Sequence, residues 1–474
     1  MSNRNNSGRE LLANTMVFGF GTILSKLIFI ILLPVYTTYL TASEYGAGEL
    51  VMNCLNFIFP LTSLSILSAL LRFGMDKKKD LNKVLQSTLY VILIGFFVAA
   101  ALITTIQFNS SINEWKGYLI ILLFSYSLNQ ILSVMSKAVD KTIICAVGGI
   151  LGAFILLISS IVFVVCLKRG TAGYLESQIV SFFVSFCYLF HALKISKYLT
   201  FSRPDKSLLK EMVLFSVPLV FNAIAWGISN FFDRFIIEQY NSTNEVGLYS
   251  IASKIPTALG TLGAIFMNAW VLSSIKSYQE SEEQNSYFIS SVFSKFHGTM
   301  LCGASILILL TNLIMSLFTN GSYFESWKYV PLLVCAAVFS NVGNFFAAIY
   351  TAAMKNKSIM TTTIIGAVIN IVLNLLLIPR YSIQGAVIAT MASHAVIAIY
   401  RQLTVQQFCQ LKINHFISIT SLFLLVIESV FVITNKIVYA VLICLICLLL
   451  CHQTLRFMYN TGLQNIRTII GKIK

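Results

Sequence analysis

Long apolar stretches alternate with short polar segments along the whole chain. Fourteen of these stretches are of the length, about 20 residues, that an α-helix needs to cross a bilayer. They lie near residues 13–35, 50–72, 83–106, 118–137, 143–166, 173–194, 210–233, 246–271, 297–318, 330–351, 358–379, 383–405, 415–434 and 437–457. No segment between them could hold a folded soluble domain, and the ten-residue alternation of transmembrane β-strands is absent. The pattern predicts an all-α, polytopic membrane protein with about 14 transmembrane helices.

Composition and charge agree with a membrane protein. Of the 474 residues 57% are hydrophobic and only 11% are charged, a balance foreign to water-soluble domains. The net charge of +15 would suggest nucleic-acid binding in a soluble protein. With a cytoplasmic N-terminus, however, 23 of the 33 Lys and Arg residues fall in cytoplasmic segments and 7 in external ones. We therefore expect a multi-pass protein of the cytoplasmic membrane with both termini in the cytoplasm and no nucleic-acid partner.

Two pairs of similar segments indicate an internal repeat. LTASEYGAGELVM, from residue 40, resembles NSTNEVGLYSIAS, from residue 241, so that Gly46 and Gly247 occupy equivalent positions. GAFILLISSIVFVVCLKRGTAGYLESQIVS, from residue 152, parallels GAVINIVLNLLLIPRYSIQGAVIATMAS, from residue 366. Two parallel six-helix halves explain both matches. We expect a first lobe at 1–195, a cytoplasmic linker at 196–208, a second lobe at 209–408, and two additional helices with a cytoplasmic tail at 409–474.

Motifs of enzymes are missing from the sequence. It contains no G-x-x-x-x-G-K-[ST], H-E-x-x-H or G-x-S-x-G, and its five histidines are scattered. Cys444, Cys447 and Cys451 share one helical face, but no acidic or histidine partner is near, so we expect packing and not a metal site. His394 and Glu428 fall within apolar spans, where we expect contacts at helix interfaces. The sequence predicts no catalytic residue, metal or cofactor.

Charged residues within the predicted spans concentrate in equivalent helices of the two halves. Lys26 lies in the first helix, Arg72 ends the second, Asp233 and Arg234 end the seventh, and Lys254 lies in the eighth. Charge inside a membrane is expensive and normally faces the bundle interior or a water-filled cavity. We therefore expect helices one, two, seven and eight to surround one aqueous cavity.

Polar residues extend the faces that carry these charges. Asn222 shares a helical face with Asp233, and Thr257 shares one with Lys254. Pro60 and Pro256 lie within the second and eighth helices, where we expect a kink or hinge. The candidate cavity-lining residues are Lys26, Arg72, Asn222, Asn230, Asp233, Arg234, Lys254 and Thr257.

The charges in the predicted cavity favour an anionic substrate. Four cations face one acid, and Lys and Arg bind phosphate or diphosphate through charge-assisted hydrogen bonds. An exporter of organic cations would instead favour acidic groups. A structural role stays open beside the transport role: Asp233 could form a static bridge to Arg234 or Lys254.

Three segments resemble bacterial polysaccharide repeat-unit flippases, of the O-antigen type, in the multidrug/oligosaccharidyl-lipid/polysaccharide transporter superfamily. They are DRFIIEQYNSTNEVGLYSIASKI, LLANTMVFGFGTILSKLIFIILLPVYTTYLTASEYGAGEL and NIVLNLLLIPRYSIQGAVIATMAS. The resemblance implies a V-shaped, two-lobed transporter that works by alternating access. It implies a cargo of oligosaccharide repeat units on undecaprenyl diphosphate, moved from the inner to the outer leaflet for O-antigen, capsule or exopolysaccharide synthesis. By motif match, Arg72, Asp233, Arg234 and Lys254 carry over as site residues.

The partners implied by this resemblance are the lipid-linked oligosaccharide diphosphate, membrane lipid, a coupling ion (proton or sodium), a polysaccharide polymerase and glycosyltransferases. Within transporters, the alternatives are a flippase for lipid II or another cell-wall precursor, and a multidrug antiporter. A membrane-embedded polymerase or acyltransferase is the alternative from another class. We would expect such an enzyme to carry a large external loop or an acid–histidine pair, and the sequence shows neither.

Overall fold

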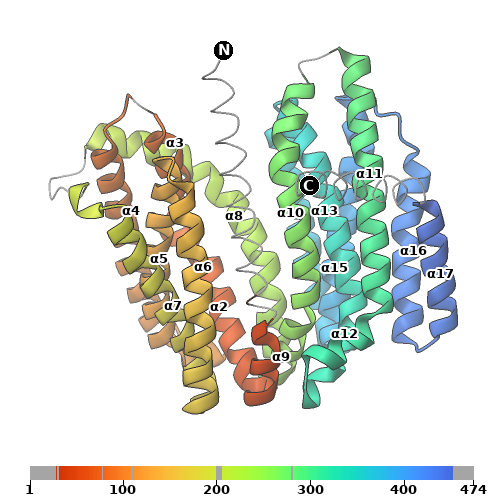
Figure 1. The fold of residues 1–474 in the computed structure, drawn as a ribbon, viewed down its shortest axis with the longest axis horizontal. Coiled ribbons are helices and arrows are strands. Elements are labelled where there is room, and N and C mark those ends of the chain that lie inside the picture. Colours follow the sequence, from red (N-terminus) through yellow and green to blue (C-terminus); the bar gives the residue numbers. More distant parts are fainter. Residues whose placement is uncertain are drawn as a thin grey trace, which may run out of the picture. The chain divides into compact units, whose positions relative to one another are not determined.

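A computed structural model of the chain describes residues 28, 31–76, 78–107, 110–198, 205–278 and 281–451, without the side chains of residues 221, 222, 225, 226, 228, 229 and 356. Regular structure in these ranges is helical throughout (Figure 1), which confirms the all-α prediction. Ten of the described helices are long and apolar enough to cross a membrane, and an eleventh span is added if a bent pair counts as one. The total of 14 stays a prediction, because the first expected span lies largely outside these ranges.

The described residues form two compact units, and the first comprises the chain up to Ser250 together with Phe318–Tyr323. After a helical segment at residues 31–39, its helices are α2 (Ala42–Thr62), α3 (Ile66–Gly74), α4 (Leu81–Thr105), α5 (Lys116–Ala138), α6 (Thr142–Ser160), α7 (Gly170–Ala192), α8 (Lys206–Tyr240) and α9 (Thr243–Ala252). Short turns η1 (Ser111–Asn113) and η3 (Ile195–Lys197) connect them, and the π-helical η2 (Ile161–Cys166) extends α6. Within this unit α5 packs against α2, α3, α4, α6 and α7, so it lies at the centre.

The second unit comprises Ile251–Leu317 and the chain from Phe324 onward. Its helices are α10 (Lys254–Ser277), α11 (Glu282–Leu309), α12 (Thr311–Phe318), α13 (Val330–Ala352), α14 (Asn356–Tyr381), α15 (Ile383–Thr404), α16 (His415–Ile433) and α17 (Ile437–Leu450), with the 3-10 segment η5 (Val405–Gln407). The 3-10 segment η4 (Gly321–Tyr329) begins in the first unit and ends in the second. The buried helix α13 packs against α10, α11, α15 and α16, while α16 and α17 form a pair against α11 (Figure 1). The two helices expected beyond the second lobe are therefore part of this unit.

The compact units differ from the lobes expected from the repeat. Helix α8, predicted to open the second lobe, packs against α2, α3 and α4 in the first unit. The chain passes to the second unit only after Ser250. Compactness groups helices by packing, whereas the lobes were inferred from similarity along the sequence. The boundaries at 195, 208 and 408 stay predictions about the repeat.

A sharp break divides the second predicted span. Helices α2 and α3 meet at an angle of 60° across residues 63–65. Pro60 lies within α2, and Leu64 and Ser65 adopt positive φ angles of 46° and 51°, so the helical hydrogen-bond pattern cannot continue. The bend expected near Pro60 is present, but the single helix expected over 50–72 is wrong.

Helix α8 begins at a strong N-cap. The Asp205 carboxylate accepts hydrogen bonds from the backbone N–H groups of Ser207 and Leu208, at 3.0 and 3.3 Å. These bonds, the one from Leu208 first, lower the pKa of Asp205, and Lys83 at 3.6 Å lowers it further. A second ion pair, from Lys79 to Glu211 at 2.6 Å, also joins this end of α8 to the segment that leads into α4. Both pairs are partly exposed, so each adds only a small stabilisation to this contact.

Helices α2 and α9 approach closely through two glycines. A Cβ atom on Gly46 would lie 2.1 Å from the carbonyl oxygen of Thr243, and one on Gly247 would lie 2.0 Å from that of Ala42. Both spacings are far below van der Waals contact, so only glycine allows this approach. Positions 42 and 243, like 46 and 247, correspond to each other in the repeat. The contact is therefore reciprocal, each glycine lying on the equivalent carbonyl of the other segment.

Candidate substrate-binding residues

Two of the predicted site residues are buried together where α8 meets α9. Asp233 and Arg234 are only 2% and 7% exposed. The Tyr249 hydroxyl donates a hydrogen bond of 2.7 Å to Oδ2 of Asp233, and Nε of Arg234 donates one of 3.1 Å to Oγ of Ser250. We call Asp233, Arg234, Tyr249 and Ser250 the α8–α9 polar cluster.

The guanidinium of Arg234 is fixed in direction. Its Nη1 donates a hydrogen bond of 2.9 Å to the backbone carbonyl of Asn230, one turn earlier in α8. Its central carbon lies 5.1 Å from the ring centroid of Tyr249, a distance suited to a cation–π interaction. Arg234 thus holds a planar positive charge in one orientation, which is the property that makes arginine a good phosphate ligand.

The polar cluster lies inside α8 and not at its end. The helix continues for seven residues past Asp233, to Tyr240, so the seventh helix is longer than the expected 210–233. Beyond the cluster, Oε1 of Glu238 accepts a hydrogen bond of 2.8 Å from the backbone N–H of Ser111. This contact joins α8 to η1.

Arg72 lies far from the polar cluster along α8. It is exposed in the last turn of α3, next to Phe73, whose ring lies 5.8 Å from that of Phe215. Phe215 precedes Asp233 by 18 residues, which is about 27 Å along a helix. Arg72 and Arg234 therefore lie at separate places within the first unit, and a role for both in one transport path stays a prediction.

The remaining predicted residues are distributed over other parts of the chain. Asn230 is exposed on α8, and its carbonyl takes part in the bond described above. Lys254 is half-buried in the second unit. It is the first residue of α10, because a turn at Ser253 ends the preceding helix. Thr257 is exposed one turn later, and its hydroxyl donates a hydrogen bond of 2.7 Å to the Ser253 carbonyl. Lys26 and the side chain of Asn222 lie outside the described residues. Their assignment to a common site stays a prediction.

A buried carboxylate in α2 escaped the sequence analysis. Glu49 is 5% exposed, and its Oε1 accepts hydrogen bonds of 2.9 Å from both the Tyr45 and the Tyr174 hydroxyls. The ring of Tyr36 lies 5.1 Å from that of Tyr174, and its hydroxyl is 2.8 Å from Oγ of Ser160. We call these five residues the tyrosine–glutamate cluster. The signal in the sequence was a tyrosine and a glutamate four residues apart, directly before the apolar run 50–72.

In the second unit, Arg401 was counted among the cytoplasmic residues but is 3% exposed within α15. Its guanidinium donates hydrogen bonds to the hydroxyls of Thr362 and Thr363, both at 2.9 Å, and to the carbonyls of Gly343 and Ile359, both at 3.2 Å. These bonds join α13, α14 and α15. The signal available in the sequence was the pair of adjacent threonines, Thr362 and Thr363, within a predicted span.

Glu428, noted in the sequence as an acid within a span, is completely buried in α16. Its Oε2 accepts a hydrogen bond of 2.7 Å from the Ser305 hydroxyl of α11, and its Oε1 has no partner among the described residues. This is the helix-interface contact expected for it. His297 of α11 makes a second contact between the same two helices, with its Nε2 2.8 Å from Oγ of Ser421 in α16.

Comparison with known proteins assigns the chain to a family. The family described as "Polysaccharide biosynthesis protein" matches residues 11–271, which is more than half of the sequence. The chain belongs to this family. The match spans the α8–α9 polar cluster and the tyrosine–glutamate cluster. A search of curated protein sequences gives no significant match.

Solved structures show the same fold at low sequence identity. The lipid II flippase MurJ, in an inward closed conformation, is 16% identical with a TM-score of 0.69, covering 94% of this chain and 100% of its own. An inward-facing multidrug resistance MATE family transporter of the MOP superfamily is 14% identical with a TM-score of 0.65, covering 81% and 95%. A MOP superfamily transporter from Pyrococcus furiosus Vc1 (DSM3638) is 15% identical with a TM-score of 0.56, covering 83% and 94%.

The family and the shared fold agree with the predicted all-α, multi-pass membrane protein. The chain belongs to a polysaccharide biosynthesis family, has the fold seen in solved MOP superfamily transporters, and contains ten described helices that are long and apolar enough to cross a membrane. The resemblance inferred from its motifs is correct. The identity of the cargo and the roles of single residues go beyond these comparisons.

Proposed function

We propose that the chain is a flippase that moves undecaprenyl-diphosphate-linked oligosaccharide repeat units from the inner to the outer leaflet by alternating access. The observation that carries the proposal is membership of a polysaccharide biosynthesis family in a chain with a transporter fold. Polysaccharide repeat units are assembled on a lipid carrier, and a transporter in such a pathway has that lipid as its natural cargo. The products served would be O-antigen, capsule or exopolysaccharide.

The buried cation Arg234 supports a diphosphate as the recognised group. Its guanidinium is held by Ser250, Asn230 and the Tyr249 ring, so it does not have to be ordered when an anion binds. A guanidinium held in one orientation matches the oxygens of a phosphate. Lys26, Arg72 and Lys254 would supply positive charge at other points of the proposed transport path. Asp233 beside it would then orient the arginine and limit the net attraction.

The proposed setting is the bacterial cytoplasmic membrane, with both termini in the cytoplasm. The Lys and Arg distribution supports this orientation. A coupling ion, proton or sodium, would drive the cycle, and a polymerase and glycosyltransferases would act on the same lipid-linked units. Asn222, Asn230 and Thr257 are the proposed polar neighbours of the charged groups.

Deletion of the gene tests this function. Lipid-linked repeat units should accumulate in the inner leaflet, surface polysaccharide should disappear, and a plasmid copy should restore both. Unchanged surface glycan combined with reduced export of cationic dyes would replace the flippase proposal with a multidrug antiporter.

A flippase for lipid II is the second candidate. The observation that favours it is the likeness to MurJ, whose whole length is covered. Expression of this chain in cells depleted of their own lipid II flippase distinguishes the two. Under the first proposal growth is not restored, whereas full rescue would make the cell-wall precursor the cargo.

A further inference from the structure

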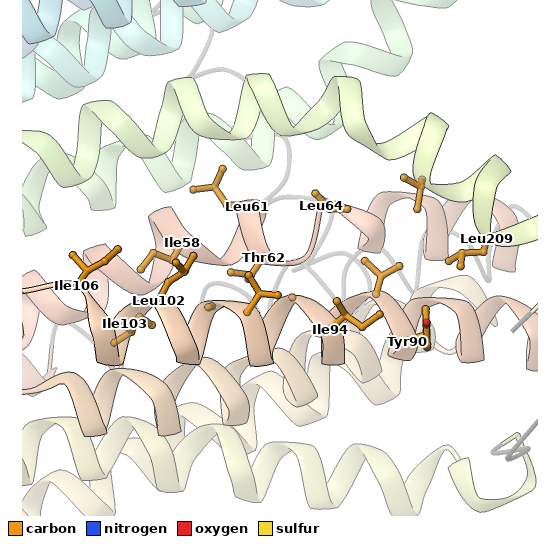
Figure 2. A pocket seen from close by; sticks show the side chains of 15 residues that line it. Ile58, Leu61, Thr62, Leu64, Tyr90, Ile94, Leu102, Ile103, Ile106 and Leu209 are labelled. Atoms are coloured by element: carbon orange, nitrogen blue, oxygen red, sulfur yellow. The ribbon is translucent and has the colours of Figure 1, made fainter. Parts of the chain in front are cut away.

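An apolar groove of about 550 Å³ runs along α4 in the first unit. Figure 2 shows side chains of α4 and of the α2–α3 region lining it, with Leu209 of α8 near the Tyr90 end and Ile106 at the opposite end. Among the labelled residues only Thr62 and Tyr90 carry polar side-chain atoms, and the Thr62 hydroxyl already donates to the Phe59 carbonyl. The groove is therefore suited to hydrocarbon.

The break between α2 and α3 creates this groove. Where α2 ends, α4 approaches so closely that a Cβ atom on Gly95 would lie 1.7 Å from the Thr62 carbonyl oxygen. Thr62 and Gly95 both line the groove, so backbone atoms at the break form part of its wall. Beside this contact, α4 presents half-exposed apolar side chains such as Ile94, Val98 and Leu102.

One end of the groove is basic. Leu209 and Val213 of α8 line it, and Lys206 and Lys210 lie one helical turn before them on an exposed surface. On the facing segment, Lys79 and Lys83 are already paired with Glu211 and Asp205. The facing segment also carries Asp76, Lys78 and Asp80, so with Asp205 and Glu211 included the positive and negative charges there nearly balance. Lys206 and Lys210, exposed at the start of α8, provide the positive charge that favours an anionic head group beside the apolar surface.

The length of the groove separates two kinds of lipid. From Tyr90 to Ile106 are 16 residues, or about 24 Å along α4. One leaflet supplies only half of a hydrocarbon core of about 30 Å, so a phospholipid held at the basic end would fill part of the groove. A chain longer than one leaflet would fill it.

We propose that this groove binds the hydrocarbon chain of a polyprenyl diphosphate, with the diphosphate at the lysines that open α8. The proposal rests on the proposed function, because a flippase for lipid-linked sugars must handle a carrier of this chemistry. It adds a binding site that is separate from the α8–α9 polar cluster. The long chain would remain against α4 while the head group is transferred.

Binding of undecaprenyl diphosphate to the purified full-length protein, followed by native mass spectrometry, tests this proposal. Ile94→Trp fills the groove and should weaken binding about tenfold. Ile158→Trp on α6 is the matched control, since both isoleucines are 47% exposed and only Ile94 lines the groove; its binding should equal that of the wild type. The double variant Lys206→Gln and Lys210→Gln should weaken undecaprenyl diphosphate about tenfold and leave uncharged undecaprenol unchanged.

Wild-type affinity in a monodisperse Ile94→Trp protein would overturn the groove proposal. Equal displacement of the probe by phosphatidylglycerol would overturn it as well, because the occupant would then be an ordinary membrane phospholipid. The proposed function is tested separately, by the deletion strain. If that strain still makes normal surface polysaccharide, the flippase proposal is refuted. The binding site would still stand if the groove variant binds less carrier.

Discussion

Buried charged residues in this chain are held by hydroxyl and carbonyl groups of neighbouring helices. Glu49 accepts from two tyrosines, Arg234 donates to a serine and a carbonyl, and Arg401 donates to two threonines and two carbonyls. Around Glu49 and Arg401, such groups satisfy a charge without adding a second one to the membrane interior. Each of these sites therefore depends on the position of more than one helix.

Glu49 is expected to stabilise the first unit. In Glu49→Ala the Tyr45 and Tyr174 hydroxyls lose their shared acceptor, and each buried unsatisfied group costs about 1–3 kcal/mol. The variant should unfold at a clearly lower temperature in detergent, as measured by size-exclusion chromatography after heating. The control is Glu325→Ala, because the Glu325 side chain is 70% exposed and only pairs with Lys328 on the surface. Equal melting of both variants would show that the cluster carries no stability.

A substitution of Arg234 can distinguish a transport role of this residue from a structural one. Arg234→Lys keeps the charge but loses the planar fork, so export should fall roughly tenfold or more while the abundance of the protein stays near normal. Export is measured as surface polysaccharide per molecule of transporter in the membrane. Ser250→Ala removes only the acceptor of Nε and should reduce export less. A loss of abundance that accounts for the whole loss of export would make Arg234 a structural residue.

The sequence identified candidate site residues where a charged side chain interrupts an apolar run. Asp233 and Arg234 were found in this way, and the structure brings them together with Tyr249 and Ser250. Glu49 was missed because its partner Tyr174 is 125 residues away and a tyrosine in a span carries no signal by itself. Three-dimensional neighbours of this kind do not follow from periodicity.

Helix lengths and breaks were predicted less well than the all-helical class of the fold. The apolar run 50–72 does not reveal the break at residues 63–65, because Leu64 and Ser65 have ordinary side chains and only their φ angles end the helix. Helix α8 extends past the expected end: its last turns contain the buried Ile236 and Ile237, and Glu238 joins them to η1. Hydropathy reports which residues tolerate lipid, and helices continue into polar surroundings where contacts support them.

The glycine contact between α2 and α9 gives a prediction at the scale of elements. Gly46→Ala would place a methyl group against backbone atoms that cannot rotate away, so it should destabilise the fold by about 1–3 kcal/mol. Gly247→Ala should do the same for the reciprocal reason. Gly303→Ala in α11 is the control, since nothing lies within 4 Å of its added Cβ and the substitution should be neutral or stabilising. Thermal unfolding of the three variants measures this, and an unchanged Gly46→Ala protein would refute the close packing.

At the scale of the whole molecule, the Lys and Arg bias predicts which loops face the cytoplasm. In a version without its ten cysteines, Lys206→Cys should react with a membrane-impermeant thiol reagent only after the cells are opened. Lys436→Cys, exposed between α16 and α17, should react on intact cells. Labelling of position 206 on intact cells would show that the predicted orientation is wrong.

The reciprocal glycine contact also has a consequence for synthesis. Gly46 and Gly247 are 201 residues apart, so at roughly 5–20 residues per second the second glycine is made about 10–40 s after the first. During this interval the surface of α2 around Gly46 has no α9 to pack against. A chain halted before α9 would therefore keep the surface of α2 around Gly46 without its packing partner.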